Sequence, residues 1–357
     1  MKRALPIRQE RRAFLVATAL AALAAFMPAA FTFAQADDLV VGSWGGVWDD
    51  TVKQAVGSKF TAETGSQIQI VPGTSTDQFA KLIANPDSPP FDVLYIDLDA
   101  AAAGFSQGLF RKLDVATIPN LAKVYPNAIY GGGQAVAASF GAISIVYNQA
   151  KVPSVDSWSI FSDPANAGKY ALNVVDGWAL YMLPVFGKIK SGSTDDFDGA
   201  FDAIKAIAPG ASQSLGDEAL HQSFASGDVL FAPMYSGEAY VMYQAGQKDI
   251  RLAKPKEGMV AVPNLLVIPA HAKHPELAEK FINAALEESA QTTFATQYAS
   301  APSVTSVKLD PSMAQWMATG AQEVGALIQP NWVKLNAQRD ALVQRWNTDI
   351  VPEIGAK

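Results

Sequence analysis

The sequence contains no cysteine and only three histidines. The lack of cysteine excludes disulfides, thiolate nucleophiles, cysteine-ligated metal sites and the acylated cysteine of a bacterial lipoprotein. The histidines form no metal-binding motif, because His271 and His274 lie three residues apart without a glutamate motif, and His221 lies far from both. We expect His271 and His274 to be solvated residues at the start of a helix.

The motifs of several enzyme classes are also missing. We find no G-x-S-x-G nucleophile elbow, no phosphate-binding G-x-x-x-x-G-K-[ST] loop, and no G-x-G-x-x-G after the first predicted strand. The sequence therefore favours a protein that is not an enzyme and that binds no cofactor and no metal. An envelope hydrolase stays open as the enzymatic alternative, since sequence spacing does not reveal paired carboxylates.

Residues 1–36 have the organisation of an export signal. Five Lys or Arg residues lie among the first twelve positions, an apolar segment runs from Ala13 to about Phe33, and Ala34-Gln35-Ala36 offers small residues for cleavage. We predict a cleaved signal and a periplasmic protein. The segment "RRAFLV" resembles a twin-arginine signal, but nothing indicates a cofactor loaded in the cytoplasm, so we expect the general secretory route.

The exported chain, residues 37–357, is acidic and long enough for about two domains. Its formal net charge is −11, because the signal removes five Lys or Arg residues and one Glu from a chain of net charge −7. Binding to nucleic acid requires a clustered basic surface, so nucleic acid is not an expected partner.

The first part of the exported chain alternates between strand and helix patterns. Residues 38–43, 67–71 and 92–96 are strand-like, and apolar residues at helical spacing follow the first two strands. This order predicts an α/β domain with a mainly parallel sheet, in which ligands bind at the carboxyl ends of the strands. Trp44 and Asp97 lie at two such ends.

A second α/β block and two amphipathic segments follow. Strands are predicted at 141–148 and 264–269, and helices near 195–208 and 217–226. The segment 274–295 predicts one helix with an apolar face, and the segment 331–350 predicts another that packs onto its own lobe.

Several segments occur in the order of one known family. They include "VVGSWGG", "FDVLYID", "GAISIVYN", "GDVLFAPMYSGEAY" and "NWVKLNAQRDALVQRWN". The chain resembles the extracellular solute-binding proteins of bacterial ABC importers, in particular the spermidine/putrescine-binding periplasmic branch. The resemblance implies a periplasmic binding protein type II-like fold, with two α/β lobes joined by crossing strands and a ligand cleft between them. It implies lobe 1 at 37–141 plus 266–305, and lobe 2 at 142–265 plus 306–357.

The resemblance also implies a function and a set of ligand-binding residues. The protein would capture a small amine-containing solute, a polyamine or a zwitterionic amino-acid-like compound, and deliver it to an ABC permease in the inner membrane. A cation over an aromatic face and a charge-assisted hydrogen bond both favour an amine. The implied residues are Trp44, Asp97, Asp176, Trp178, Tyr235, Glu238 and Asn264.

Some of these positions have a second interpretation. Asp176 suits a turn beside Gly177, and Glu238 suits the first turn of a helix. Asp99, two positions after Asp97, is expected to be the N-cap of the helix that follows.

One departure from the family pattern concerns the solute. Val262 and Asn264 stand where the polyamine-binding relatives have an aromatic residue and a carboxylate. A diamine or triamine is therefore less certain, and a smaller or zwitterionic amine fits at least as well. A thiamine-type or iron(III)-binding protein of the same fold is the alternative, the iron being held by tyrosines such as Tyr235, Tyr240 and Tyr243.

Overall fold

The computed structural model describes residues 37–175 and 178–356. The predicted export signal and Asp176 therefore lie outside the described residues. No helix in the described ranges is both long and apolar enough to cross a membrane.

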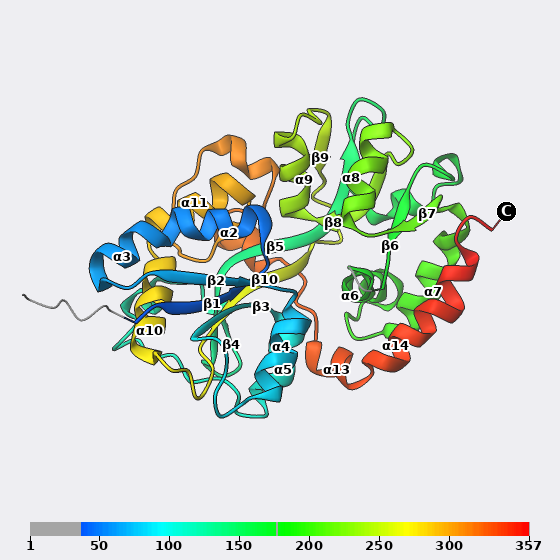
Figure 1. Ribbon diagram of the computed structural model, residues 1–357. Helices are drawn as coiled ribbons and strands as arrows, with labels where there is room; N and C mark the ends of the chain where they lie inside the picture. Colours follow the sequence, from blue (N-terminus) through cyan, green and yellow to red (C-terminus); the bar gives the residue numbers. More distant parts are fainter. Residues whose placement is uncertain (1–36, 176–177, 357) are drawn as a thin grey trace, which may run out of the picture. The chain divides into compact units, whose positions relative to one another are not determined.

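The predicted parallel pairing of the first three strands is confirmed, but the prediction of a mainly parallel sheet is wrong, because the other strand pairs of this sheet are antiparallel. Strand β1 (Leu39–Ser43) pairs in parallel with β2 (Ile68–Pro72) on one side and with β3 (Val93–Asp97) on the other. Strand β10 (Val260–Val267) continues the sheet antiparallel to β3, and β5 (Ala135–Asn148) pairs with β10 (Figure 1). The carboxyl ends of β1 and β3 therefore lie at the same edge.

Helices pack on both faces of this sheet because its side chains alternate. Val93 and Tyr95 of β3 belong to one hydrophobic cluster, and Leu94 and Ile96 belong to another. The first cluster includes residues of α2 (Gly46–Val52), the π-turn η2 (Lys53–Gly57), α3 (Ser58–Thr64), α10 (Pro275–Ala285) and α11 (Glu288–Tyr298). The second includes residues of α4 (Ser75–Ala84) and α5 (Leu98–Phe105) (Figure 1).

Strand β5 is long enough to pair with strands in two parts of the fold. Its first half pairs with β10, and its second half pairs with β8 (Phe231–Tyr235) and β9 (Ile250–Leu252). A short parallel pair, β6 (Ala171–Asn173) and β7 (Gln213–Leu215), lies beside β8 through a bridge between Tyr170 and Phe231. The helices of this part are α6 (Ala179–Ser191), α7 (Phe197–Ile207), α8 (Asp217–Ser226) and α9 (Ser236–Gln244).

The remaining elements are short. They are β4 (Ile129–Tyr130), β11 (Ala301–Pro302), α12 (Gly320–Gly325) and the 3₁₀ turns η3 (Pro119–Lys123), η4 (Pro126–Ala128), η5 (Trp158–Ser162), η6 (Pro164–Asn166), η7 (Ala208–Gly210), η8 (Pro311–Gln315) and η10 (Val351–Glu353).

The prediction of one helix over 274–295 is wrong. Helix α10 ends at Ala285, and α11 begins at Glu288, because Glu287 has an extended backbone with φ −79° and ψ 150°. The break lets α11 turn and stack Phe294 on Trp48, with ring centroids 5.2 Å apart. Packing against α2 therefore overrides a continuous helical pattern.

The C-terminal segment is also broken where one helix was predicted. Helix α13 (Trp332–Ala337) and helix α14 (Arg339–Arg345) flank Gln338, whose φ of −122° is not helical, and the π-turn η9 (Trp346–Ile350) follows. The expected apolar residues Leu335, Leu342 and Trp346 are buried. Helix α13 contacts α5, whereas η9 contacts α7 (Figure 1), so the break lets the segment pack on two different partners.

The two histidines near α10 differ from each other. The side chain of His271 is 62% exposed, as predicted. The prediction of solvation is wrong for His274, whose side chain is only 14% exposed. Its backbone N–H donates to Asp92 Oδ1 (2.7 Å), and its Nδ1 lies 3.2 Å from Asp92 Oδ2. The buried carboxylate of Asp92 therefore draws this ring into the structure.

Candidate functional site

One cavity of about 610 Å³ brings together residues from distant parts of the chain. Six of the seven predicted binding residues line it: Trp44, Asp97, Trp178, Tyr235, Glu238 and Asn264. The seventh, Asp176, lies outside the described residues. The structure thus brings six of the predicted residues to one cavity, and their role in ligand binding stays a prediction.

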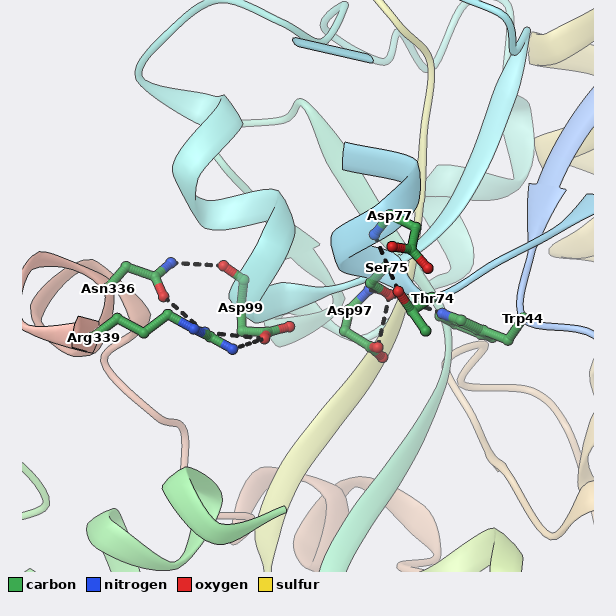
Figure 2. A network of polar contacts seen from close by, with 8 residues as sticks. All are labelled: Trp44, Thr74, Ser75, Asp77, Asp97, Asp99, Asn336 and Arg339. Carbon is green, nitrogen blue, oxygen red and sulfur yellow. Dashed lines mark hydrogen bonds and ion pairs between the residues drawn. The ribbon is translucent and has the colours of Figure 1, made fainter. Parts of the chain in front are cut away.

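Trp44 is held at one wall by a serine that no sequence pattern indicated. The indole Nε1–H donates to Ser75 Oγ (2.8 Å), and the Ser75 hydroxyl donates to Asp97 Oδ2 (2.7 Å). Ser75 Oγ also accepts the backbone N–H of Asp97 (3.0 Å), so both of its lone pairs and its proton are used (Figure 2). Trp44 is half-buried and leans edge-on against the buried Trp48, with centroids 5.0 Å apart. The indole is therefore a fixed surface of the cavity.

The carboxylate of Asp97 lies in an environment that opposes its charge. Burial and the neighbouring Asp99 raise the pKa of Asp97 to about 7, although the Ser75 hydrogen bond acts in the opposite direction. Asp97 precedes α5 and does not cap it, because its side chain is turned towards Ser75 instead. A cation in the cavity would lower the free energy of the ionised form.

Asp99 is not the N-cap that the sequence predicted. Helix α5 begins at Leu98, so Asp97 occupies the N-cap position and Asp99 lies in the first turn. The Asp99 Oδ2 atom lies 3.3 Å from both terminal nitrogens of Arg339, and the Asp99 carbonyl accepts the Asn336 amide (2.6 Å) (Figure 2). Asp99 therefore ties the C-terminal segment to α5 at the cavity wall.

Tyr235 and Trp178 form a second aromatic surface. Their rings stack with centroids 5.4 Å apart and an interplanar angle of 16°. The Tyr235 ring lies directly over Gly141 of β5, where an added Cβ would be 2.1 Å from the ring. Glycine at this position is what allows the tyrosine to lie flat between β5 and Trp178.

A second acidic pair lies beside these rings. The Trp178 indole donates to both oxygens of Asp217 (3.1 and 3.0 Å). Burial and the charge of Glu238 raise the pKa of Asp217 to about 6, with Trp178 and His221 acting against this rise. Glu238 does lie in the first turn of α9 as its second interpretation held, and it also lines the cavity.

Glu238 already has partners of its own. Tyr298 Oη donates to Glu238 Oε1 (2.7 Å), and His221 Nε2 lies 3.1 Å from Oε2. Burial opposes ionisation, but His221 and Tyr298 together hold the pKa of Glu238 below its usual value. The pKa of Glu238 is therefore lowered by its partners, whereas the hydrogen bonds to Trp178 and the charge of His221 only partly offset the raised pKa of Asp217.

Asn264 is a nearly buried residue of the cavity wall. Its Nδ2 donates to Ser139 Oγ (2.9 Å), and its side chain also contacts the Tyr235 hydroxyl at 3.2 to 3.3 Å. The β10–β5 register shifts between Asn264 and Leu265, a bulge that re-aims neighbouring side chains. Val262, the other departure from the family pattern, is fully buried and does not line the cavity.

Two further polar groups on the cavity wall are buried. The Tyr181 hydroxyl and the Trp48 indole nitrogen have no hydrogen-bond partner among residues 37–175 and 178–356. Burial raises the pKa of Tyr181 well above its usual value, as do the nearby charges of Asp99 and Asp97. Within these ranges, each group therefore keeps an unused hydrogen-bond donor.

Sequence reasoning missed several cavity residues. They are Ser75, Tyr181, Asp217, Tyr298 and Arg339. Asp217 had a usable signal, since it stands at the start of a predicted helix as Asp99 does. Arg339 had none, because its partner Asp99 is 240 positions away.

The tyrosines considered for iron do not gather in the cavity. Tyr240 donates to the carbonyl of Thr296 (3.0 Å), and Tyr243 packs on Trp316 with centroids 4.8 Å apart. Within the described ranges, no three His, Asp or Glu side chains form a group that could hold a metal ion.

Comparison with known proteins places these features in a family. Residues 55–321 match the family model described as bacterial extracellular solute-binding protein. The chain belongs to the bacterial extracellular solute-binding protein family. The predicted class, a solute-binding protein, is thereby confirmed.

Individual relatives agree with this assignment. The chain is 26% identical over 247 residues to the spermidine/putrescine-binding periplasmic protein of Escherichia coli, covering 66% of this chain and 70% of that one. It is also 26% identical over 288 residues to the gamma-aminobutyric acid-binding protein of Pseudomonas aeruginosa, covering 75% and 78%.

A solved structure supports the fold. An extracellular solute-binding protein of Bordetella parapertussis superposes with a TM-score of 0.77 at 20% identity, covering 88% of this chain and 99% of that one. This neighbour bears on the architecture alone. The predicted two-lobed α/β architecture of periplasmic binding proteins is confirmed, and the family is one of binding proteins.

Proposed function

We propose that this protein captures a small solute bearing amino groups and delivers it to an ABC permease in the inner membrane. The observation that carries this proposal is a pair of acids, Asp97 and Asp217, each facing the cavity beside a tryptophan. Among the described residues, neither forms an ion pair with Lys or Arg. Each is held by an indole, Asp97 through Ser75 and Asp217 directly.

Electrostatics favour a cation in such a cavity. The two acids have pKa values raised to about 7 and about 6, so their charges are costly while the cavity lacks a cation. An ammonium group removes this cost and donates charge-assisted hydrogen bonds to the carboxylates. The indole faces of Trp44 and Trp178 add cation–π attraction of about 0.5 to 2 kcal/mol each.

The same two acids favour a solute with an amino group at each end. Asp97 ends β3, and Asp217 begins α8, so the two lie on separate elements. The carboxylate that raises the pKa of Asp97 is Asp99, and the one that raises the pKa of Asp217 is Glu238, which makes the two acidic pairs electrostatically separate. The names of the relatives include both diamine and amino-acid binders.

A zwitterionic ω-amino acid is the second candidate. The cavity contains one guanidinium, Arg339, and the unpartnered Tyr181 hydroxyl among the described residues. Together they could receive a carboxylate while Asp217 receives the amine. For this candidate, the Arg339 guanidinium would have to contact the carboxylates of Asp99 and of the solute at the same time.

Delivery and export complete the proposal. The relatives named above are periplasmic or bind solutes, and residues 1–36 have the composition of a cleavable secretory signal. We infer that the mature protein begins at Asp37, works in the periplasm without enzymatic activity, and has lobes bounded as the sequence predicted.

A thermal-shift and calorimetric screen tests the proposal. We expect 1,4-diaminobutane to raise the melting temperature, since a ligand at one hundred times its Kd adds about 2.7 kcal/mol of stability. The variants Asp97→Asn and Asp217→Asn should each weaken binding, whereas Asp228→Asn, an exposed acid outside the cavity, should not. Stabilisation by neutral sugars alone would refute the amine assignment.

A further inference from the structure

Arg339 is the one basic residue among the described residues of the cavity lining, whose other charged members are acids. Its guanidinium comes from the C-terminal segment, at the break between α13 and α14, and it contacts the same oxygen of Asp99 with two nitrogens at 3.3 Å. The contact also includes Asn336 Oδ1 (3.3 Å). The Asp99 side chain is 15% exposed and that of Arg339 is 40% exposed.

This contact changes the charge that a solute meets. Asp97 and Asp99 stand two positions apart at the start of α5, and the charge of Asp99 raises the pKa of Asp97. The Arg339 guanidinium is a permanent positive charge that pairs with Asp99 and offsets part of its negative charge. The ammonium of a solute at this end therefore meets one uncompensated acid instead of two.

We propose that Arg339 determines the specificity of the cavity by acting as a built-in cation on Asp99, which limits the number of solute amino groups that the cavity accepts. This inference rests on the proposed function and names the residue that restricts the solute. Without the guanidinium, Asp99 becomes a further anionic site next to Asp97. A longer amine with an additional charge can use that site, whereas a diamine already satisfied by Asp97 and Asp217 gains less.

The test compares amines of different charge on matched variants. Calorimetric titration at pH 8 measures the affinities of 1,4-diaminobutane, spermidine and 4-aminobutyrate for wild type, Arg339→Gln and Arg339→Lys. We expect Arg339→Gln to raise the affinity for spermidine relative to 1,4-diaminobutane about tenfold or more, which is the value of one hydrogen bond to a charged group. Arg339→Lys keeps the charge and should keep the wild-type ratio.

Two controls separate charge from structure. Lys334→Gln removes one positive charge from the same segment, but Lys334 pairs with Asp195 (2.8 Å), outside the cavity, and its ratio should equal that of wild type. Asn336→Ala removes the amide bond to the Asp99 carbonyl without changing the charge. A similar tenfold change in the affinity ratio in either control would overturn the specificity role of Arg339. For Lys334→Gln the cause would be the general positive charge of the segment, and for Asn336→Ala it would be the hydrogen bond between Asn336 and Asp99.

The acid partner provides a second line of evidence. In an Asp99→Asn background, Arg339→Gln should no longer change the ratio of the two affinities, because no carboxylate is released. Asp99→Asn alone leaves an uncompensated guanidinium in the cavity and should weaken binding of both amines at least about tenfold. If Arg339→Gln does not fold, this single variant still tests the inference, and unchanged affinities would overturn it.

Other outcomes are equally distinct. An equal loss of affinity for all three solutes in Arg339→Gln would mean that Arg339 has only a structural role in the cavity wall. Selective loss of 4-aminobutyrate would mean that it receives a carboxylate, as the second candidate function requires. Both results overturn the inference and leave the proposed amine binding intact, whereas a wild-type protein that binds no amine refutes the proposed function itself.

Discussion

Asn264 of β10 lies directly opposite Asp97 of β3 in an antiparallel pair, and both side chains line the same cavity. Directly opposite residues in such a pair have Cβ atoms about 4.5 to 5.5 Å apart. The neutral amide beside an acid with a raised pKa keeps a second negative charge away from Asp97. This pairing makes Asn264 a sensitive position for both stability and solute choice.

The variant Asn264→Asp should destabilise the unliganded protein. It replaces an amide that donates to Ser139 with an acceptor and places a carboxylate opposite Asp97. We expect a loss of about 1 to 3 kcal/mol in the free energy of unfolding, larger at pH 8 than at pH 5 because both acids are ionised at the higher pH. Urea unfolding at the two pH values measures this, and a larger loss at pH 5 would contradict the electrostatic explanation.

The same variant distinguishes the two kinds of solute. An added carboxylate should tighten binding of 1,4-diaminobutane relative to 4-aminobutyrate, because an ionised acceptor binds ammonium about twice as strongly as a neutral one and repels a carboxylate. Calorimetric titration with both solutes gives the ratio. A preference that moves towards 4-aminobutyrate would contradict the diamine assignment, and an unchanged preference would mean that Asn264 does not face the solute.

Amine binding should weaken as the pH falls. The solute stays protonated, whereas Asp97 has a pKa of about 7 in the unliganded cavity and must lose its proton to bind an ammonium. One titrating group makes affinity about tenfold lower at pH 6 than at pH 8, and Asp217, with a pKa of about 6, adds to the loss below that. Calorimetric titrations of the amine between pH 5 and pH 8 measure this dependence. In Asp97→Asn the affinity should change less with pH between pH 6 and pH 8.

Stability without solute should have the opposite dependence on pH. Between pH 3.8, the usual pKa of an aspartate, and about pH 7, the raised pKa of Asp97 in the folded protein, the folded protein keeps a proton on Asp97 that the unfolded chain releases. The Asp97 contribution to stability is therefore largest at low pH and is lost as the pH rises through this window. Comparing the melting temperatures of wild type and Asp97→Asn over the same window isolates this contribution. If the difference between the two proteins does not change with pH, the Asp97 carboxyl is not in the environment described here.

Trp44 and Trp48 should respond differently to the same substitution. Trp44 is half-buried at the cavity, so Trp44→Ala should weaken amine binding and leave most of the stability. Trp48 is 3% exposed and packs on Tyr95, Phe294 and Tyr298, so Trp48→Ala should cost about 3 to 5 kcal/mol of folding free energy. Denaturant unfolding and calorimetry on both variants measure this contrast. Wild-type affinity with a large loss of stability in Trp44→Ala would identify Trp44 as a core residue.

Cleavage should follow Ala36. The basic start, the apolar segment and Ala34-Gln35-Ala36 predict that the periplasmic protein begins at Asp37. Intact mass spectrometry of the periplasmic fraction measures this directly. Recovery of the uncleaved chain in the membrane fraction would contradict it.

Much of the site could be anticipated because local sequence sets local structure. The apolar runs at 38–43 and 92–96 predicted the buried strands, and the parallel order predicted that Trp44 and Asp97 emerge at one edge of the sheet. The inferences about the strands and their shared edge succeed because side-chain alternation and turn residues act over a few positions. The amine-containing solute was implied by the family resemblance and stays a prediction.

The sequence by itself determined the solute-binding family, the α/β strand order and most of the predicted cavity residues. Only the tertiary structure decided that Asp99 pairs with Arg339 and does not cap α5. It also decided that Asp217 accepts a hydrogen bond from Trp178. The helical patterns break at Glu287 and Gln338 for the same reason, because packing interrupts the local helical pattern there. The physical reason is that these contacts join residues far apart in the sequence, whereas sequence patterns report only local preferences. An acid in a first turn suits a cap, a solvated face or an ion pair equally well by local propensity, and only the chain that packs beside it chooses among them.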